Sequence, residues 1–554
     1  MSSSIEPYRI ELDKLNQQLE ETSDVEHRKS LIDSFSSKFL LLPNFWKLRL
    51  KYEFTLDYER EKKLVKKALF DFYSRDFYES LDPMLKCQLC LEPQPFDRIM
   101  KWEHVEAFKS DCLALMGKDE NALEYNIKEA LSYPHSNLKD VYQCYREYSG
   151  SPVTKEIRQM FQYCHLLYMN IQDSQRSVLQ WFNALCETDD DRFIIQNIEY
   201  KLSELPNTPS LWKLYIQWLN GKNKKAALEV YYRYRRLFLD DIKMDSEMNL
   251  ESFRPSLTEH RYLHKMKFKK SHHKSKPNSS SSSQNSITFY FTSESQSFQR
   301  FDFPTSVIDA IIKNASPELL QKLYQCSKYF FNKTRKPLCH SLFIGNTYQV
   351  RYFGQSLAVD EKFLDFNGLN NLRIANAVIV RNHFRQDLLS TIIPKLDSCV
   401  ARFIRIHAQI LSASDYGFLT SSGNVEKIVL SEVTIFEKDG TLISLENLLK
   451  PLPKAIHIEI PIKTAITSAT ASILSKMKRQ SKFDLLQFFI CAHLYPKGFI
   501  KFLTENAAEN SCVKIHFDES LNHLYTDFFL PTVQHSLEQH SCKYGTIVPH
   551  FKVF

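Results

Sequence analysis

The chain has 554 residues, which suggests more than one domain, and its 43% hydrophobic and 25% charged residues are an ordinary globular composition. Its 12 scattered cysteines favour a reducing compartment over a disulfide framework, and its 11 glycines count against glycine-rich phosphate loops. The opening MSSSIEPYRI lacks the apolar core of a secretory signal, and no apolar run reaches the ~18 residues of a membrane span, so we expect no membrane partner. The net charge of +7 is concentrated in one segment.

The first 240 residues repeat an aromatic pattern at helical spacing. Five units carry apolar, aromatic or arginine side chains three residues apart, which places them on one face of a helix. The units hold Trp46, Arg49 and Tyr52; Trp102, Val105 and Phe108; Tyr142, Tyr145 and Tyr148; Leu179, Phe182 and Leu185; and Trp212, Tyr215 and Trp218. The units follow one another after 56, 40, 37 and 33 residues, and the longest gap implies an insertion or a degenerate extra unit. Helix pairs with a period in the thirties must bury their faces against neighbouring pairs. Residues 1–240 are therefore predicted to form an all-α helical-repeat solenoid.

The first-helix pattern W-x-x-[YR]-x-x-[YW], followed by a helix with small residues such as Ala226 and Ala227, resembles HAT (half-a-tetratricopeptide) repeats. The WKL tripeptides at 46–48 and 212–214 carry the resemblance, and the middle units match less closely. It implies a scaffold in RNA processing, such as pre-mRNA splicing. A generic helical repeat with no connection to RNA is the alternative.

Cys87 and Cys90 form a C-x-x-C pair in this half. A structural zinc site needs four ligands, usually from a second pair, and no matching C-x-x-C or H-x-x-x-H lies nearby. We therefore expect two cysteines of a helix, with no metal and no cofactor.

Residues 241–295 are predicted to be a disordered linker. The serine-rich stretch 277–286 has too few apolar side chains to offset the entropy of ordering it. The preceding segment 261–276 holds seven Lys and Arg and no acidic residue. It is interpreted as a nuclear localisation signal, a nonspecific nucleic-acid contact or a solvated run of charge. The lysines of the localisation interpretation are Lys265, Lys267, Lys269, Lys270, Lys274 and Lys276.

Residues 296–340 are predicted to form two or three short helices. Pro304 can open the first after Phe303, and valine and isoleucine side chains then recur at helical spacing. Ser316 is a favourable N-cap for the next helix, with Pro317 at its first position. A unit of ~40 residues is too small to be stable alone, so it must pack on the next domain, on a partner or on both.

This stretch resembles an F-box, whose pattern is a Leu-Pro start, a Val/Ile ladder and a helix of spaced leucines ending in Val-[Ser/Cys]-Lys-x-[Phe/Trp]. Phe303 replaces the leucine and Cys326 the valine, and both keep apolar character. The resemblance implies binding to a Skp-type adaptor of a cullin–RING ubiquitin ligase. An ordinary helical cap on the following domain is the alternative. The implied partner-binding residues are Phe303, Pro304, Val307, Ile308, Ile311, Ile312, Leu319, Leu320, Leu323, Ser327 and Phe330.

Residues 341–554 alternate short strands with helices. Strands are predicted around Leu372 and Ile374, Ile404 and Ile406, Ile428 and Leu430, Ile456 and Ile458, Leu486 and Phe488, and Val513 and Ile515. Helical segments at 385–396, 442–452 and 470–477 occupy intervals between them. One strand and one helix about every 28 residues is typical of a leucine-rich-repeat-like α/β solenoid. The consensus asparagine is missing, and an open α/β sheet of other topology is the alternative.

Several histidines lie in or beside these strands, but no motif gathers them with an acid or a nucleophile. A catalytic base needs a positioned partner within hydrogen-bond reach, so we predict no enzymatic activity. The residues concerned are His407, His457, His493 and His516, with Cys491, Asp484 and Asp518 nearby.

An F-box followed by repeats resembles the substrate receptors of SCF-type ubiquitin ligases. That resemblance implies a non-catalytic adaptor, nuclear, cytoplasmic or both, whose repeats hold an unidentified protein target. The alternative function is a nuclear RNA-processing scaffold that acts with splicing proteins through the HAT-like half. The two halves point to different processes, so either one protein joins them or the chain is a fusion of neighbouring coding units.

Overall fold

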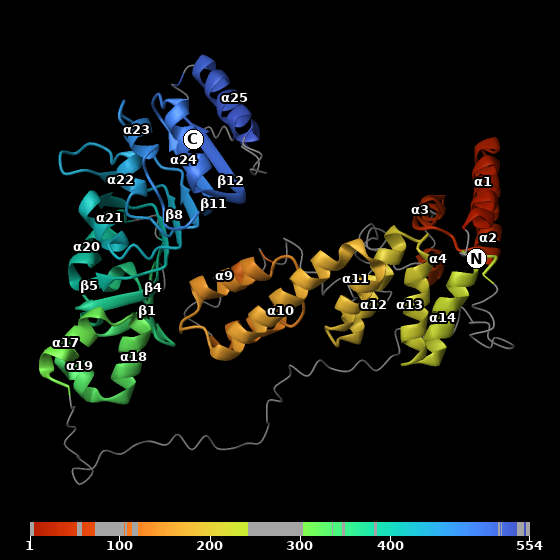
Figure 1. Ribbon diagram of the computed structural model, residues 1–554, viewed down its shortest axis with the longest axis horizontal. Helices are drawn as coiled ribbons and strands as arrows, with labels where there is room; N and C mark the ends of the chain where they lie inside the picture. Colours follow the sequence, from red (N-terminus) through yellow and green to blue (C-terminus); the bar gives the residue numbers. More distant parts are fainter. Residues whose placement is uncertain are drawn as a thin grey trace, which may run out of the picture. The chain divides into compact units, whose positions relative to one another are not determined.

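The computed structural model describes most of the chain (Figure 1). The described residues are 5–52, 58–71, 105, 108–112, 120–241, 303–334, 336–345, 350–381, 385–518, 521, 523–539 and 548–549. Among these, no helix combines the length and the apolar character needed to cross a membrane. Residues 242–295 of the predicted linker, with its lysines, and the pair Cys87 and Cys90 lie outside the described residues.

The chain divides into two compact units. The first comprises Met1–Val105, Lys128–Lys139 and Glu156–Ile287. The second comprises Glu106–Ile127, Asp140–Lys155 and Thr288–Phe554. The division differs from the predicted boundary at residue 240, because two stretches of the N-terminal half belong with the C-terminal sheet.

The first unit is helical, as predicted. Its helices are α1 (Glu6–Glu21), α2 (Val25–Lys38), α3 (Pro43–Tyr52), α4 (Tyr58–Asp71), α10 (Lys155–Asp173), α11 (Val178–Cys186), α12 (Asp191–Glu204), α13 (Pro209–Asn220) and α14 (Lys224–Arg235). Local chemistry sets several starts: the side chains of Asp24, Asp190 and Asn223 accept hydrogen bonds from backbone amides at the beginnings of α2, α12 and α14. Pro209 opens α13, where a missing N–H costs nothing.

The aromatic residues of the predicted repeats form much of this unit's core. Trp46 on α3 and Trp212 on α13 are fully buried, and α13 and α14 form the predicted helix–turn–helix pair. The first and last predicted repeats also meet: Arg236, just after α14, pairs with Asp71 of α4 at 2.6 Å and donates to the Phe39 carbonyl at 2.8 Å. A solenoid stacked strictly in chain order would separate these repeats, so the helices of this unit do not stack in simple chain order.

The second unit is built on an 11-stranded mixed sheet, in which the described pairs are parallel except β2 with β3. The strand order is β13-β12-β11-β10-β8-β6-β4-β1-β3-β2, with β5 beside β4. The strands are β1 (Leu338–Gly345), β2 (Arg351–Phe353), β3 (Ser356–Val359), β4 (Leu372–Arg381), β5 (Leu396–Cys399), β6 (Phe403–His407), β8 (Lys427–Ser431), β10 (His457–Ile460), β11 (Phe483–Ile490), β12 (Ala507–Phe517) and β13 (Val548–Pro549). All six predicted strands are confirmed, with Ile456 one residue before β10.

Helices connect the parallel strands, and Figure 1 shows α20 to α23 along one side of the sheet. They are α20 (Leu388–Ile392), α21 (Ala413–Thr420), α22 (Leu445–Leu449), α23 (Thr470–Leu474), α24 (Pro496–Asn506) and, after β12, α25 (His523–Gln539). The three predicted helical segments correspond to α20, α22 and α23. A small second sheet pairs β7 (Ile410–Ser412) with β9 (Thr434–Phe436).

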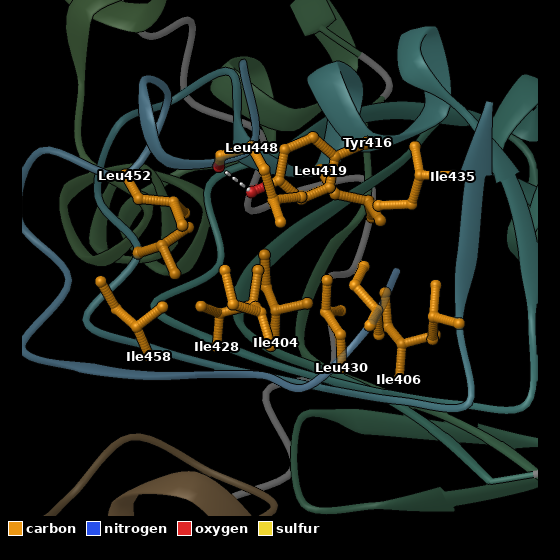
Figure 2. Packing of buried hydrophobic residues seen from close by; sticks show 14 of the residues in the cluster. Ile404, Ile406, Tyr416, Leu419, Ile428, Leu430, Ile435, Leu448, Leu452 and Ile458 are labelled. Atoms are coloured by element: carbon orange, nitrogen blue, oxygen red, sulfur yellow. Dashed lines mark hydrogen bonds between the residues drawn. The ribbon is translucent and has the colours of Figure 1, made fainter. Parts of the chain in front are cut away.

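One face of the sheet and these helices enclose the core of the second unit. Ile404 of β6 pairs in register with Ile428 of β8, which pairs with Ile458 of β10, so equal side chains form a ladder across the strands. Figure 2 shows this ladder facing leucines that include Leu448, and Tyr416 donates a hydrogen bond to the Leu448 carbonyl at 2.6 Å. Because strand side chains alternate, the residues between ladder positions point to the opposite face of the sheet.

Candidate protein-docking surfaces

The F-box-like segment forms three helices, α17 (Thr305–Asn314), α18 (Pro317–Cys326) and α19 (Lys328–Thr334). The predicted cap of α18 is confirmed, since the Ser316 hydroxyl accepts from the Leu319 amide. The helices have a small core of their own, in which each side chain is at most 8% exposed. Its members are Ile308, Ile312, Leu320 and Phe330, with Leu323 and Tyr324 packed against them.

A second set of apolar side chains on these helices is exposed. Val307 and Ile311 lie one turn apart on α17, displaced by one position from the buried pair Ile308 and Ile312. The exposed set is 38% to 63% accessible and consists of Phe303, Val307, Ile311 and Leu319, which we call the α17 face. Isolated exposed apolar residues are common, but four within one short helical segment mark a candidate interaction site.

The structure divides the predicted partner-binding residues into three groups. The α17 face is accessible, and Pro304 is exposed beside it, whereas the four core members stabilise the helices themselves. Leu323 and Ser327 are half-buried. The sequence showed one apolar stripe at i, i+1, i+4 and i+5, and this spacing does not say which of its residues face inward.

The helices are attached to the sheet by contacts near the start of β1. Lys336 forms an ion pair of 2.6 Å with Asp397, and Tyr324 donates to the Lys336 carbonyl at 3.3 Å. Gln321 of α18 donates a hydrogen bond to Gln355. The segment therefore packs on the following domain, while the α17 face remains accessible.

The other candidate surface is the sheet face opposite the ladder. It is occupied by part of the N-terminal half, namely α9 (Leu138–Tyr148) and the residues after it. Glu147 of α9 is 2% exposed and pairs with Arg405 of β6 and Lys427 of β8, each at 2.9 Å. Arg405 lies between the ladder residues Ile404 and Ile406, so this contact is on the far side of the sheet from the helices.

Arg146 adds a second charged contact beside the first. Its guanidinium lies 3.0 Å from a carboxylate oxygen of Glu426 and 5.3 Å from the ring centroid of Phe403. Glu426 also pairs with Arg402. Adjacent residues of α9 therefore carry opposite charges, and each meets its complement on the sheet.

Backbone carbonyls at the end of α9 meet polar groups of the sheet. The side-chain amide of Asn376 donates to the Arg146 carbonyl at 2.9 Å, and the Ser356 hydroxyl donates to the Gly150 carbonyl at 2.8 Å. The backbone N–H of Gln355 also donates to the Gly150 carbonyl, at 2.9 Å. The last carbonyls of a helix lack partners within it, and here Asn376 supplies one for Arg146.

The two basic side chains set the ionisation of Glu147. Burial raises the pKa of this carboxyl, but the Coulomb interactions and hydrogen bonds of Arg405 and Lys427 outweigh burial, so the pKa lies below its ordinary value. Glu459 of β10 behaves in the same way: burial raises its pKa, but the hydrogen bond from His457 at 2.6 Å and the nearby basic side chains outweigh burial, so its pKa also lies below the ordinary value. Arg405 and Lys427 thus lie within an ionic cluster on this face.

The contact between α9 and the sheet was not predicted. The sequence pattern assigned Tyr142, Tyr145 and Tyr148 to a repeat core; Tyr145 and Tyr148 are buried, while Arg146 and Glu147 between them reach the sheet. A local period cannot identify contacts so distant in sequence. The signal available in the sequence was a basic residue in each of two consecutive strands, Arg405 in β6 and Lys427 in β8, which indicates a site for an acidic partner.

The histidines considered for catalysis are dispersed along the sheet. His407 lies 3.9 Å from Glu432, and His516 exchanges a hydrogen bond with Gln487 at 2.7 Å. The Cys491 thiol donates to the Thr464 carbonyl. Within the residues that the structure describes, no group of three or more His, Cys, Asp or Glu could hold a metal ion.

No protein-family model matches the chain, and no curated protein matches it.

Proposed function

We propose that the protein is a non-catalytic substrate receptor of a cullin–RING ubiquitin ligase. In this proposal the F-box-like helices bind a Skp-type adaptor, and the α/β domain, as a divergent leucine-rich-repeat-like solenoid, holds a protein target. Binding both partners raises the effective concentration of the target at the ligase. The protein would act in the nucleus, the cytoplasm or both.

The observation that carries the proposal is the accessible α17 face on a helical unit with its own core. Val307 and Ile311 expose apolar surface that is favourable to bury, at roughly 25 cal/mol per Å². The F-box resemblance of the same residues supports a Skp-type adaptor as the partner. An ordinary cap would direct its apolar residues inward and leave a polar outer face.

The test is size-exclusion chromatography of the full chain mixed with a purified Skp-type adaptor. The wild-type chain should co-elute with the adaptor, and Ile311→Asp should not. Lys313 lies on the same helix, is exposed and does not belong to the α17 face. Lys313→Asp therefore introduces the same side chain outside that face and should retain binding. Failure of the folded wild-type chain to co-elute would refute the proposal.

A second candidate function is an RNA-processing scaffold built on HAT-like repeats. It is favoured by the α13–α14 pair, in which the WKL helix is followed by a helix with buried Ala226 and Ala227. Copurification of the full chain with splicing proteins, retained in the Ile311→Asp variant, would support it. A chain that copurifies with none of them and resides only in the cytoplasm would count against it.

A further inference from the structure

The sheet face that contacts α9 has the features of a recognition site for a protein segment. It presents two adjacent bases, an acid, an aromatic ring and hydrogen-bond donors for backbone carbonyls. The residues that provide them are Arg405, Lys427, Glu426, Phe403, Asn376 and Ser356. Phe403, Arg405 and Lys427 alternate with residues of the ladder and therefore point to the opposite face, and the other three contact the same segment. We call this set the β4–β8 face.

The segment seated there matches the β4–β8 face group by group. Its acid meets the two bases, its base meets the acid and the ring, and its free carbonyls meet the donors. Glu147 and Arg146 supply the charges, and the carbonyls of Arg146 and Gly150 supply the acceptors. Gly150 lies where a larger residue would collide, since an added Cβ would come within 2.5 Å of the Phe353 ring. The complementarity thus includes charge, hydrogen bonding and shape.

We propose that the β4–β8 face binds the C-terminal end of a helix bearing an Arg-Glu pair followed by a small residue, and that residues 142–151 occupy it as an internal competitor. The ligand is therefore a helical segment of a protein target with this chemistry. The inference rests on the proposed function in one respect, namely that the bound helix belongs to a protein target of the ligase. Occupation of the site by a peptide can be measured without any ligase component.

An internal segment competes at an effective concentration in the millimolar range, so an external copy at micromolar concentration should be excluded. Reversing the charge of Glu147 should release the segment, because a cation buried between Arg405 and Lys427 would be strongly repelled. The vacated face should then accept the external copy, whose own glutamate is intact.

The experiment measures fluorescence anisotropy of a labelled peptide with the wild-type sequence of residues 138–152. Full-length Glu147→Lys should bind it at least about tenfold more tightly than the wild-type chain, given the internal competition. Adding Lys427→Glu to Glu147→Lys should remove that gain. Glu129→Lys, at an exposed site on α8 (Glu120–Ala130), is the matched control and should behave as wild type.

Thermal melting followed by circular dichroism establishes that each variant is folded. If Glu147→Lys does not fold, the isosteric Glu147→Gln replaces it and should show a smaller gain in peptide affinity. Equal peptide affinity for the wild-type chain and the folded variant would overturn the proposal. So would the absence of binding to the folded variant, because the contact would then be an attachment point without independent affinity. Neither result would affect adaptor binding through the α17 face, so the two proposals can fail separately.

Discussion

Glu147 of α9 and Arg405 of β6 are separated by 258 positions in the chain and form a buried ion pair of 2.9 Å. The pair joins a segment of the N-terminal half to the sheet of the C-terminal half within one compact unit. Removing one partner of a buried pair typically costs about 3–5 kcal/mol, since the other charge remains desolvated.

The attachment of α9 should weaken at acidic pH. The pKa of Glu147 is lowered in the folded chain, so its contribution to stability is complete above the ordinary glutamate value of about 4.3 and is lost as the pH falls through the depressed value. Amide hydrogen exchange of residues 140–151, corrected for the intrinsic effect of pH, should accelerate as the pH falls through the depressed pKa of Glu147. Glu147→Gln should abolish this specific pH dependence. Unchanged protection down to the acid unfolding of the whole unit would contradict it.

Gly150→Ala should displace the segment from the sheet. Its Cβ would lie 2.5 Å from Cδ2 and 2.8 Å from the carbonyl oxygen of Phe353, both too close without movement of one side. We expect a loss of about 1–3 kcal/mol, as for other overpacked sites, measured by thermal unfolding.

Gly417→Ala is the matched control for this substitution. Gly417 lies in α21, and a methyl group added at its Cα would meet no atom within 4 Å outside its chain neighbours and the backbone of its own helix, so alanine should be neutral or stabilising by up to about 1 kcal/mol. A Gly150→Ala chain as stable as the Gly417→Ala chain would contradict this prediction, because Phe353 would then move aside at little cost in free energy.

Neighbouring isoleucines of α17 should respond differently to truncation. Ile312→Ala removes a buried side chain and should cost about 2–5 kcal/mol of local stability, read as faster amide exchange in α17 to α19. Ile311→Ala should change that exchange by less than about 0.5 kcal/mol, because its side chain is already exposed. Equal effects of the two substitutions would contradict the assignment of two faces.

Arg236 should contribute strongly to the stability of the first unit. Burial raises the pKa of Asp71 and the ion pair with Arg236 opposes this effect, so Arg236→Ala leaves an unpaired buried carboxyl group. We expect a loss of about 3–5 kcal/mol in urea denaturation. Tryptophan fluorescence reports on this half alone, because all five tryptophans precede residue 219.

Two variants complete the Arg236 experiment. Lys224→Ala, an exposed site on α14, should change stability by less than about 0.5 kcal/mol. Adding Asp71→Asn to Arg236→Ala should recover part of the loss, since the orphaned charge is removed. A fluorescence transition unaffected by Arg236→Ala would mean that the first and last repeats do not stabilise each other.

The sequence predicted those features that depend on local periodicity. Alternating apolar residues identified the strands that hold Ile404, Ile428 and Ile458, and the hydroxyl group of Ser316 identified it as a cap. The meeting of Arg236 with Asp71 was not predictable, because an interrupted helical pattern does not specify which helices become neighbours.

The candidate sites show the same limit. The apolar residues of α17 were recognisable, but only packing distinguishes Ile308, which stabilises the helices, from Val307, which is exposed. The sequence pattern assigned no role to Glu147. Its partners lie on strands in the other half of the chain, and no local pattern connects them.

Adaptor binding through the α17 face is tested most directly by isothermal titration of a purified Skp-type adaptor into the full chain. The wild-type chain should bind one adaptor per chain, and Ile311→Asp should weaken binding by at least about tenfold, equivalent to about 1.4 kcal/mol. Lys313→Asp should match the wild type. A folded wild-type chain that produces no binding heat at several temperatures, or an Ile311→Asp chain that binds as tightly as wild type, would contradict the proposed docking.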